Sequence, residues 1–423
     1  MYQSLANKAL RRAFAASLLV IAAGGVSASG LTIEEAGRLA LKDDYTLKAI
    51  NAHSEAMSEL AIATGKLPDP QLKLGFANLP TDSFNLGQEP MTQTVIGVRQ
   101  MFPRGQTRAL SSQRVNESVA GNDAGAEDRR QQILLTVRET YIRIYLHQER
   151  KKILRQSKVI FADLAEITRD YYANGRAHQQ DVVQTQLELS RVEERLALMQ
   201  QEEERERSRL AEWIGADAYR ELDPQWPDVD LPEPAQIIIE ELTKHPRLRA
   251  WQHEIAKFKT SEEIARQAYK PGFAVDLAYG GRSGQNPDGS DRSDFLSVFV
   301  TMDIPLFTKN RQDRQLASSI ADTSAKQFAR DDIYRSMKAR VEEYTATLSG
   351  ERERLGMYEE FLLPQAAFNA EAAFQAYQDA VNDLTTLMRA RIGEYELKLS
   401  HAALRADEIT TRARLLYLQG EHS

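Results

Sequence analysis

The sequence contains no cysteine among its 423 residues. This absence excludes a disulfide framework, thiolate chemistry and any cysteine-based metal site. It also excludes a lipid anchor on a cysteine, so membrane attachment would have to come from the fold. Long apolar runs are missing as well, because after residue 28 no stretch approaches the roughly 20 apolar residues of a transmembrane helix. A membrane role would therefore require strands that close into a barrel.

Catalytic and metal-binding motifs are also absent. The sequence has no phosphate-binding loop, no nucleophile elbow and no paired histidines at metal-ligand spacing. We therefore expect no enzyme activity, no cofactor and no metal site. His245 and His253 lie eight residues apart without an acidic partner at ligand spacing, and we interpret them as packing or surface residues.

Residues 1–28 have the pattern of an export signal. Three basic residues precede an apolar stretch at 13–23, and Val26-Ser27-Ala28 forms a small-residue cleavage site. A short membrane anchor is the weaker alternative, because the apolar run is too short to span a bilayer. Removing the segment takes away three of the 54 basic residues and none of the 61 acidic ones, which leaves a formal charge of −10. We expect no nucleic-acid partner for so acidic a chain.

The remaining sequence consists of two related halves. Residues 172–215 and 377–420 align without a gap at an offset of 205, and VRQMFP at 98–103 aligns with VTMDIP at 300–305 at an offset of 202. A repeat of this length predicts duplication of a whole structural unit. The expected organisation is a signal at 1–28, a first repeat at 29–215, a proline-rich linker at 216–234 and a second repeat at 235–423.

Each half is predicted to contain a helix, two strands, a long helix and a further helix. In the first half these are 31–66, opened by a Thr32–Glu35 capping box, then 71–77, 92–102, 106–173 and a helix ending at 214. In the second half they are 235–269, 273–279, 295–304, 309–377 with a kink at Pro364, and 381–418.

The helix lengths predict an elongated shape. At 1.5 Å per residue the long helix spans roughly 100 Å, and the two shorter helices of the first half together span about 108 Å. Two short helices in line therefore match one long helix, as in a helical cylinder or rod.

The last helix of the first half has a coiled-coil seam. Leu189, Val192, Leu196 and Met199 are spaced by three and four residues, and the same phase continues through Glu203, Glu206, Leu210 and Trp213. The acidic run EEERERSR at 202–209 is interpreted as a solvated helix face, with a ligand-binding role as the alternative.

The strands of the second half have one apolar face and one polar face. Phe273, Val275, Leu277 and Tyr279 alternate with Ala274, Asp276 and Ala278, and 295–304 alternates in the same way. Strands of about ten residues with apolar side chains on the outer face and polar side chains on the inner face are typical of a water-filled barrel in lipid. The alternative is a soluble ribbon packed on a core. Four strands cannot close a barrel, for which about eight are needed, so membrane strands would require several chains.

Taken together, these motifs resemble the TolC family of outer-membrane efflux channels. The resemblance covers nearly the whole mature chain and rests on the duplicated plan, LPDPQLKL before the first strand, VRQMFPRGQ and VTMDIPLFTKN at the strand–helix junctions, and YANGRAHQQDVVQTQ at the first tip. The motifs LPDPQL and QMFPRGQ are most similar to those of the branch of this family that works with heavy-metal pumps.

The resemblance implies a mainly α fold with a small membrane β-barrel portion. Three identical chains would each contribute four strands to a shared 12-stranded barrel in outer-membrane lipid. Their long-helix hairpins would form an α-helical barrel in the periplasm, which docks a periplasmic adaptor (a membrane fusion protein) and an inner-membrane pump of the RND type. The loops 78–91 and 281–293 would face outside.

The same resemblance places the periplasmic end of the channel at two hairpin tips, where the family's channel is closed at rest and meets its adaptor. The residues expected at these tips are Tyr172, Asn174, Gly175, Arg176 and Asp181 in the first repeat, and Tyr377, Asp379, Asp383, Thr386 and Arg389 in the second.

The two tips differ in sequence. Gly175 corresponds to Ala380, where a left-handed turn would be costlier, and Asp181 corresponds to Thr386. Asp379 and Asp383 could supply a ring of like charge that selects cations, and Arg389 could pair with one of them; solvated turn carboxylates are the alternative. His178 is interpreted as an exposed loop histidine, with metal sensing or adaptor contact as alternatives.

A passive export duct is therefore the function that the sequence favours. The alternative is a periplasmic coiled-coil scaffold or adaptor without its own barrel, although adaptors carry one helical hairpin and this chain has two. No residue supports an enzyme built on a coiled-coil frame.

Overall fold

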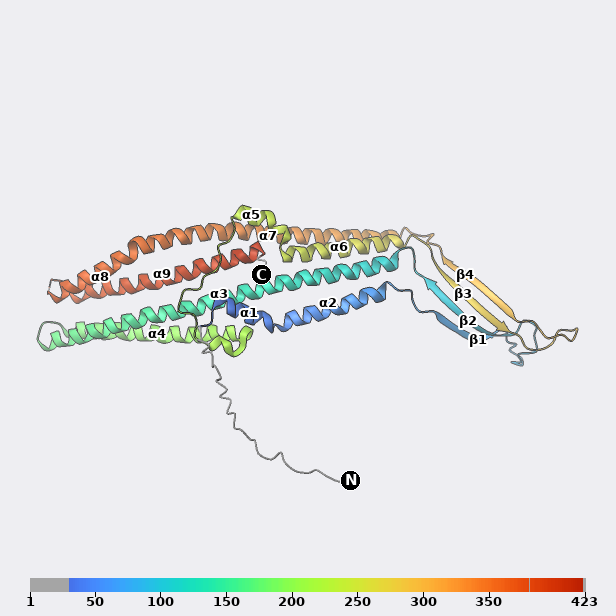
Figure 1. The fold of residues 1–423 in the computed structure, drawn as a ribbon, viewed down its shortest axis with the longest axis horizontal. Helices are drawn as coiled ribbons and strands as arrows, with labels where there is room; N and C mark the ends of the chain where they lie inside the picture. The colour runs from blue at the N-terminus through green and yellow to red at the C-terminus, as the bar shows by residue number, and fades with distance from the viewer. Residues whose placement is uncertain (1–29, 380, 421–423) are drawn as a thin grey trace, which may run out of the picture.

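The computed structural model describes residues 30–379 and 381–420, which form a long helical layer with a four-stranded sheet at one end (Figure 1). The predicted export signal lies outside the described residues. The first repeat contains α1 (Ile33–Lys42), α2 (Tyr45–Thr64), β1 (Gln71–Ala77), β2 (Gln93–Phe102), α3 (Thr107–Ala173) and α4 (Gln179–Ile214), followed by the 3-10 helix η1 (Gly215–Tyr219).

The second repeat has the same plan. It contains α5 (Ala235–Glu241), the 3-10 helix η2 (Leu242–Lys244), α6 (Pro246–Gln267), β3 (Gly272–Gly281), β4 (Phe295–Asp303), α7 (Gln312–Met357), the π-helical turn η3 (Tyr358–Leu362), α8 (Leu363–Gln378) and α9 (Leu384–Gln419). The predicted order of helices and strands is therefore confirmed in both halves.

The length prediction is confirmed as well. Helix α3 has 67 residues, which corresponds to about 100 Å. Helices α2 and α4 lie in line along it, one toward the sheet and the other toward the far end (Figure 1).

The two short helices that precede the sheet strands are divided, which the sequence prediction missed. The helix expected at 31–66 breaks before Asp44, whose Oδ1 accepts the Leu47 N–H at 2.7 Å and begins α2. The helix expected at 235–269 is interrupted by η2, and α6 starts at Pro246. Both breaks occur where a side chain can cap a new helix or where proline lacks an N–H to donate.

Only half of the predicted capping box forms. Thr32 Oγ1 accepts the Glu35 N–H at 3.2 Å. The Glu35 carboxylate instead accepts a 2.8 Å hydrogen bond from Arg220 in the linker. The start of the first repeat is thus tied to the segment that leads into the second.

The irregularity expected at Pro364 is present. Helix α7 passes through the π-helical turn Tyr358–Leu362 immediately before α8, and the ribbon bends there toward the tips (Figure 1). Proline lacks an N–H and clashes with the preceding turn, so a locally widened turn is a physical way to continue the helix.

The helices form one layer rather than a bundle. Near the sheet the order across the layer is α2, α3, α6 and α7, and near the tips it is α4, α3, α9 and α8. Helices α2 and α4 form one long edge of the layer, and α7 and α8 form the other. Large apolar side chains are exposed on both edges, including Leu60, Ile62 and Leu187 on the first and Phe328, Phe361 and Phe368 on the second.

The largest core cluster lies at mid-length, where the two repeats and the linker meet. It includes Leu31, Tyr141 and Leu210, all at most 1% exposed. The Tyr141 hydroxyl donates to the Leu31 carbonyl at 2.6 Å, and the Tyr145 hydroxyl donates to the Pro224 carbonyl at 2.7 Å. The linker is therefore part of the core and holds the two repeats together.

The packing interpretation of His245 is confirmed. Its Nδ1 accepts the Arg247 N–H at 3.2 Å and its Nε2 lies 2.8 Å from the Tyr417 carbonyl, so the neutral ring with a proton on Nε2 satisfies both contacts. Burial lowers the pKa of His245. His253 does have an acidic partner, Glu117 Oε2 on α3 at 3.0 Å, which spacing along α6 could not reveal.

The sheet is antiparallel throughout, with the order β1-β2-β3-β4. Strands β2 and β3 pair across the repeat boundary, so the two hairpins form one sheet. This leaves β1 and β4 as edge strands.

Within the described part of the chain, no helix combines the length and apolar character needed to cross a lipid bilayer.

Candidate functional site: hairpin tips and sheet faces

The two hairpin tips lie at the same end of the molecule, opposite the sheet (Figure 1). One tip joins α3 to α4 and the other joins α8 to α9. The sequence therefore correctly paired the turns near residues 175 and 380 at one end of the layer.

The first tip is a Schellman turn. The Arg176 N–H donates to the Tyr171 carbonyl at 2.7 Å, and the Gly175 N–H donates to the Tyr172 carbonyl at 3.0 Å. Gly175 has φ of +70°, a left-handed conformation in which a Cβ atom is strained. Asn174 closes α3 with its own side chain, whose Nδ2 donates to the Asp170 carbonyl at 2.8 Å.

The second tip has the counterpart of the hydrogen bond from Arg176 to Tyr171. The Val381 N–H donates to the Ala376 carbonyl at 2.8 Å, and both residues align with the first tip at the offset of 205. Ala380, for which a costlier turn was predicted, lies outside the described residues. The chain reversal is therefore shared between the repeats even though the glycine is not.

Replacing Gly175 by alanine should lower the free energy of unfolding by about 1 kcal/mol, because the left-handed backbone disfavours a Cβ. No atom lies within 4 Å of the position that this Cβ would take, so the cost is conformational rather than steric. Gly393→Ala is the matched control, since Gly393 lies in the interior of α9 with equally open space. There alanine should raise stability by about 1 kcal/mol. Denaturant unfolding followed by circular dichroism measures the free energy of unfolding of both variants. If both substitutions changed it in the same direction, the left-handed turn at Gly175 would be contradicted.

Asp181 and Asp383 each take part in capping the helix that follows their tip. In the first tip Asp181 Oδ2 accepts the N–H of His178, three residues earlier, at 2.9 Å. In the second tip Asp383 Oδ1 accepts the N–H of Thr386, three residues later, at 2.8 Å. Asp383 aligns with His178, and Thr386 aligns with Asp181. The second tip therefore lacks an acid at Thr386, the position of Asp181, but has one at Asp383, the position of His178, at the other end of the capping box.

The capping contacts also set the ionisation of Asp383. Hydrogen bonds from the Thr386 hydroxyl and backbone N–H lower its pKa. Asp379 is exposed one residue before the undescribed position 380. Arg389, the predicted partner of these acids, is exposed and makes no ion pair with either of them among the described residues. Its positive charge nevertheless contributes to lowering the pKa of Asp383.

The two equivalent tyrosines have different environments. Tyr172 is 48% exposed, whereas Tyr377 is 8% exposed. The ring of Tyr377 lies 5.8 Å from the ring of Tyr171, and the Arg176 guanidinium lies 4.6 Å from the Tyr171 centroid on the same tip. Burial raises the pKa of Tyr377. Tyr377 therefore joins the hairpins, while Tyr172, Asn174, Gly175 and Arg176 are available to a partner.

His178 is exposed and directly precedes α4, which confirms its interpretation as a surface histidine. Within the described ranges no group of three or more His, Asp or Glu side chains is placed to hold a metal ion.

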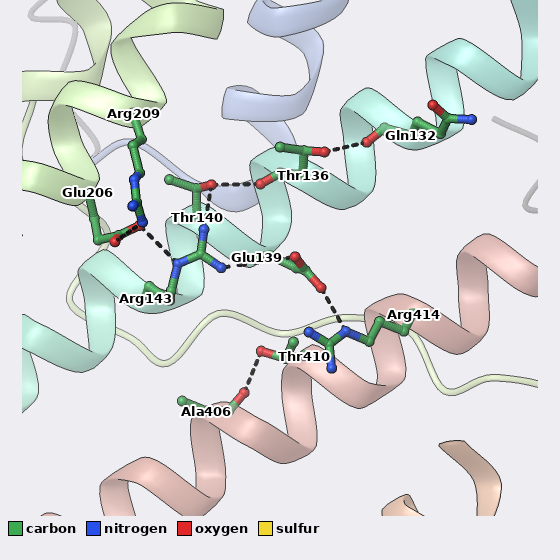
Figure 2. Close-up of polar contacts among 10 residues, drawn as sticks. All are labelled: Gln132, Thr136, Glu139, Thr140, Arg143, Glu206, Arg209, Ala406, Thr410 and Arg414. Carbon is green, nitrogen blue, oxygen red and sulfur yellow. Dashed lines mark hydrogen bonds and ion pairs between the residues drawn. The ribbon is translucent and has the colours of Figure 1, made fainter. Parts of the chain in front are cut away.

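The acidic run at 202–209 is not a solvated face throughout, which corrects the sequence interpretation. Glu203, Glu206 and Arg207 are 7%, 1% and 8% exposed. Figure 2 shows Glu206 between Arg143 of α3 and Arg209 of α4, with hydrogen bonds of 2.9 and 2.6 Å. The coiled-coil phase did contain this signal, because it placed both glutamates on the seam.

This buried network also connects the repeats. Glu139 lies beside Arg143 on α3 and accepts a 2.7 Å hydrogen bond from Arg414 of α9 (Figure 2). Charged side chains therefore run from α4 through α3 to α9. On the same seam, burial opposes ionisation of Glu203, but hydrogen bonds from Lys151, Gln148 and Arg207 outweigh it and lower its pKa.

One face of the sheet is continuously apolar and exposed. The strand register aligns two rows across all four strands, Leu72–Val98–Leu277–Val298 and Leu74–Ile96–Tyr279–Leu296. Each of these side chains is at least 46% exposed. No helix of the described chain covers this face, so the soluble-ribbon alternative, which requires packing on a core, does not fit the fold.

The opposite face is mostly small and polar, although Phe295 and Phe299 of β4 also lie on it. The row between the apolar rows is Lys73–Gly97–Ala278–Ser297. Gly97 leaves room for Lys73 to reach across β2 and form an ion pair with Asp276 of β3. Arg99 lies 3.8 Å from the other oxygen of Asp276. Lys73 and Arg99 were not identified from the sequence, because the pairing of β2 with β3 joins different repeats.

Comparison with known proteins rests on structure alone. No protein-family model matches the sequence, and no curated protein matches it. Among solved structures, that of CusC, described as undergoing transmembrane channel formation, has a TM-score of 0.77 at 13% identity over 92% of each chain. The outer-membrane protein VceC of Vibrio cholerae has a TM-score of 0.76 at 14% identity, covering 92% of this chain and 96% of that one.

A third similar structure is the open state of the MtrE outer-membrane channel of Neisseria gonorrhoeae, with a TM-score of 0.74 at 14% identity over 93% of this chain and 89% of that one. The chain therefore has the fold of outer-membrane channel proteins. Within that class it is the fold of the TolC-family efflux channels, which confirms the resemblance inferred from the motifs.

Proposed function

We propose that this protein is the outer-membrane exit duct of a tripartite efflux system. The observation that carries the proposal is the two-faced sheet at the end of a helical layer about 100 Å long. Its exposed apolar face matches the requirements of lipid, and its small polar face matches a water-filled lumen. The duct conducts passively, and the energy for transport comes from its partners.

We propose that three chains share one 12-stranded barrel. A single four-stranded sheet leaves β1 and β4 unpaired, and unpaired edges are not tolerated in lipid. Closing a barrel takes about eight strands or more, which three copies supply. The apolar side chains on both edges of the helical layer favour the same assembly, because each edge would meet the opposite edge of the next copy.

We further propose that the tips face the periplasm and bind the adaptor. Tyr172, Asn174, Gly175 and Arg176 form the most accessible part of the first tip. The inner-membrane pump of this system would be of the RND type. Assignment to the heavy-metal branch stays a prediction.

Fractionation and reconstitution test the proposal. The protein should be recovered from outer membranes as a trimer whose electrophoretic mobility changes on heating, and it should conduct ions in planar bilayers. Recovery as a soluble periplasmic monomer without conductance would instead support the scaffold or adaptor alternative.

We propose that Asp379 and Asp383 form a ring of negative charge at the periplasmic entrance. Asp379→Asn and Asp383→Asn should each reduce cation preference in single-channel recordings, because each removes three charges from the trimer. Asparagine is also a good N-cap, so Asp383→Asn keeps the helix start while removing the charge. An unchanged reversal potential in a salt gradient, with an unchanged unfolding midpoint, would leave these acids as caps or solvated turn carboxylates only.

A further inference from the structure

A cavity of about 570 Å³ lies where the sheet meets the helical layer. Its walls are the helix-proximal ends of β2, β3 and β4, the first turns of α3 and α7, and the end of α6. At this junction the sheet is inclined to the helices (Figure 1), and residues of both line the cavity. Volumes of this size are typical of small-molecule sites.

The cavity has an excess of positive charge. Its lining contains three arginines, Arg99, Arg104 and Arg114, and a single carboxylate, Asp303. Arg104 is committed to the fold, because it donates to the Ala268 carbonyl at 2.9 Å and to Asp303 Oδ2 at 3.3 Å. That pair uses the only carboxylate in the lining, which leaves two arginines for a ligand.

These two arginines are weakly engaged by the protein. Arg114 is exposed and has no acidic partner among the described residues. Arg99 has one distant contact of 3.8 Å with Asp276, whose other oxygen is taken by Lys73. The Nε atom of Arg99 is buried and has no hydrogen-bond partner in the described chain. A buried donor without an acceptor is costly unless a ligand or water satisfies it.

The rest of the lining is largely apolar. Met101 and Ala274 lie on the same sheet face as Arg99, and Ile264 and Ala265 of α6 complete the apolar lining. The cavity therefore offers guanidinium groups beside an apolar surface, all from one chain.

We propose that this cavity binds a small organic anion with an apolar body, of the carboxylate or sulfonate class. Guanidinium groups bind such oxyanions through charge-assisted, often bidentate hydrogen bonds. The apolar lining favours an apolar body beside the charged group. An inorganic anion would leave the apolar wall without a contact, and a neutral ring would leave the arginines unsatisfied. The site goes beyond the proposed duct function and does not depend on it.

Calorimetric titration of naphthalene-2-sulfonate into the full mature protein in phosphatidylcholine nanodiscs tests the site, with empty nanodiscs as the blank. We expect saturable binding at one site per chain. The double variant Arg99→Gln/Arg114→Gln should weaken the affinity by about tenfold or more, since each hydrogen bond to a charged group contributes measurably. Arg108→Gln is the matched control, because Arg108 is an exposed arginine on α3 that does not line the cavity.

A second experiment compares two ligands on the unmodified protein, so it does not depend on whether a variant folds. The neutral analogue naphthalene-2-methanol should bind about tenfold more weakly than the sulfonate or not measurably, because it cannot form charge-assisted hydrogen bonds. Absence of saturable sulfonate binding would overturn the proposal. Equal affinity for the neutral analogue, or an equal effect of Arg108→Gln, would overturn it too.

Discussion

Replacing Arg207 by methionine is expected to lower the free energy of unfolding by about 2–4 kcal/mol, because two carbonyl groups in a buried region would each lose a charged donor. The guanidinium donates to Glu203 Oε1 at 3.0 Å, to the Ala218 carbonyl at 2.6 Å and to the Arg220 carbonyl at 3.0 Å. Methionine fills a similar volume but leaves the two carbonyls without this donor, whereas Glu203 keeps Gln148 and Lys151. The loss should therefore loosen the end of α4 from the linker.

The matched control is Arg209→Met on the same helix. The Arg209 side chain is 56% exposed and pairs with Glu206, which also retains Arg143. Water can replace much of this interaction, so the expected cost is at most about 1 kcal/mol. Denaturant unfolding of the detergent-solubilised protein, followed by circular dichroism, compares the two. Equal destabilisation would show that the buried position of Arg207 has no special role.

Replacing Val298 by arginine is expected to prevent most of the protein from assembling in the outer membrane. Val298 ends the central apolar row of the sheet and is 62% exposed. In lipid, an arginine near the middle of the apolar band costs about 2–4 kcal/mol per chain. In water the same substitution at so exposed a position would change stability by only about 0.5 kcal/mol. The yield of heat-modifiable trimer in the outer-membrane fraction measures the effect.

The neighbouring substitution Ser297→Arg serves as the control. Ser297 lies on the same strand but belongs to the polar row with Lys73 and Gly97. An arginine there would face the lumen, and trimer yield should stay close to that of the unmodified protein. If both variants assembled equally well, the apolar face would not contact lipid and the membrane proposal would fail.

The element order and lengths could be predicted because they depend on local periodicity. The strands predicted at 71–77 and 295–304 agree with β1 and β4 to within one residue. The 67-residue α3 followed from a long stretch poor in glycine and proline. The divisions before Asp44 and at η2 were missed, because a capping aspartate inside a helical pattern looks like any other polar residue until the chain turns.

The candidate tips were predictable in position but not in detail. The repeat alignment put residues near 175 and 380 at equivalent turns. It also made Thr386 look like the loss of an acid, whereas Asp383 caps the same helix from the other end of the motif. Asp383 and Thr386 are three residues apart, and backbone geometry decides which of them caps the helix. A sequence alignment does not contain that geometry.

The duplication, the absence of cysteine, the long helices and the two-faced strands can all be predicted from composition and periodicity, because these are local properties that survive at low identity. The buried charges, the contact of Lys73 with Asp276 and the arginine-lined cavity are visible only in the folded chain. Each of these depends on pairing between segments of different repeats. The register of β2 on β3 and the packing of α3 on α9 set those pairs, and they follow from the summed packing of the whole layer rather than from any local pattern.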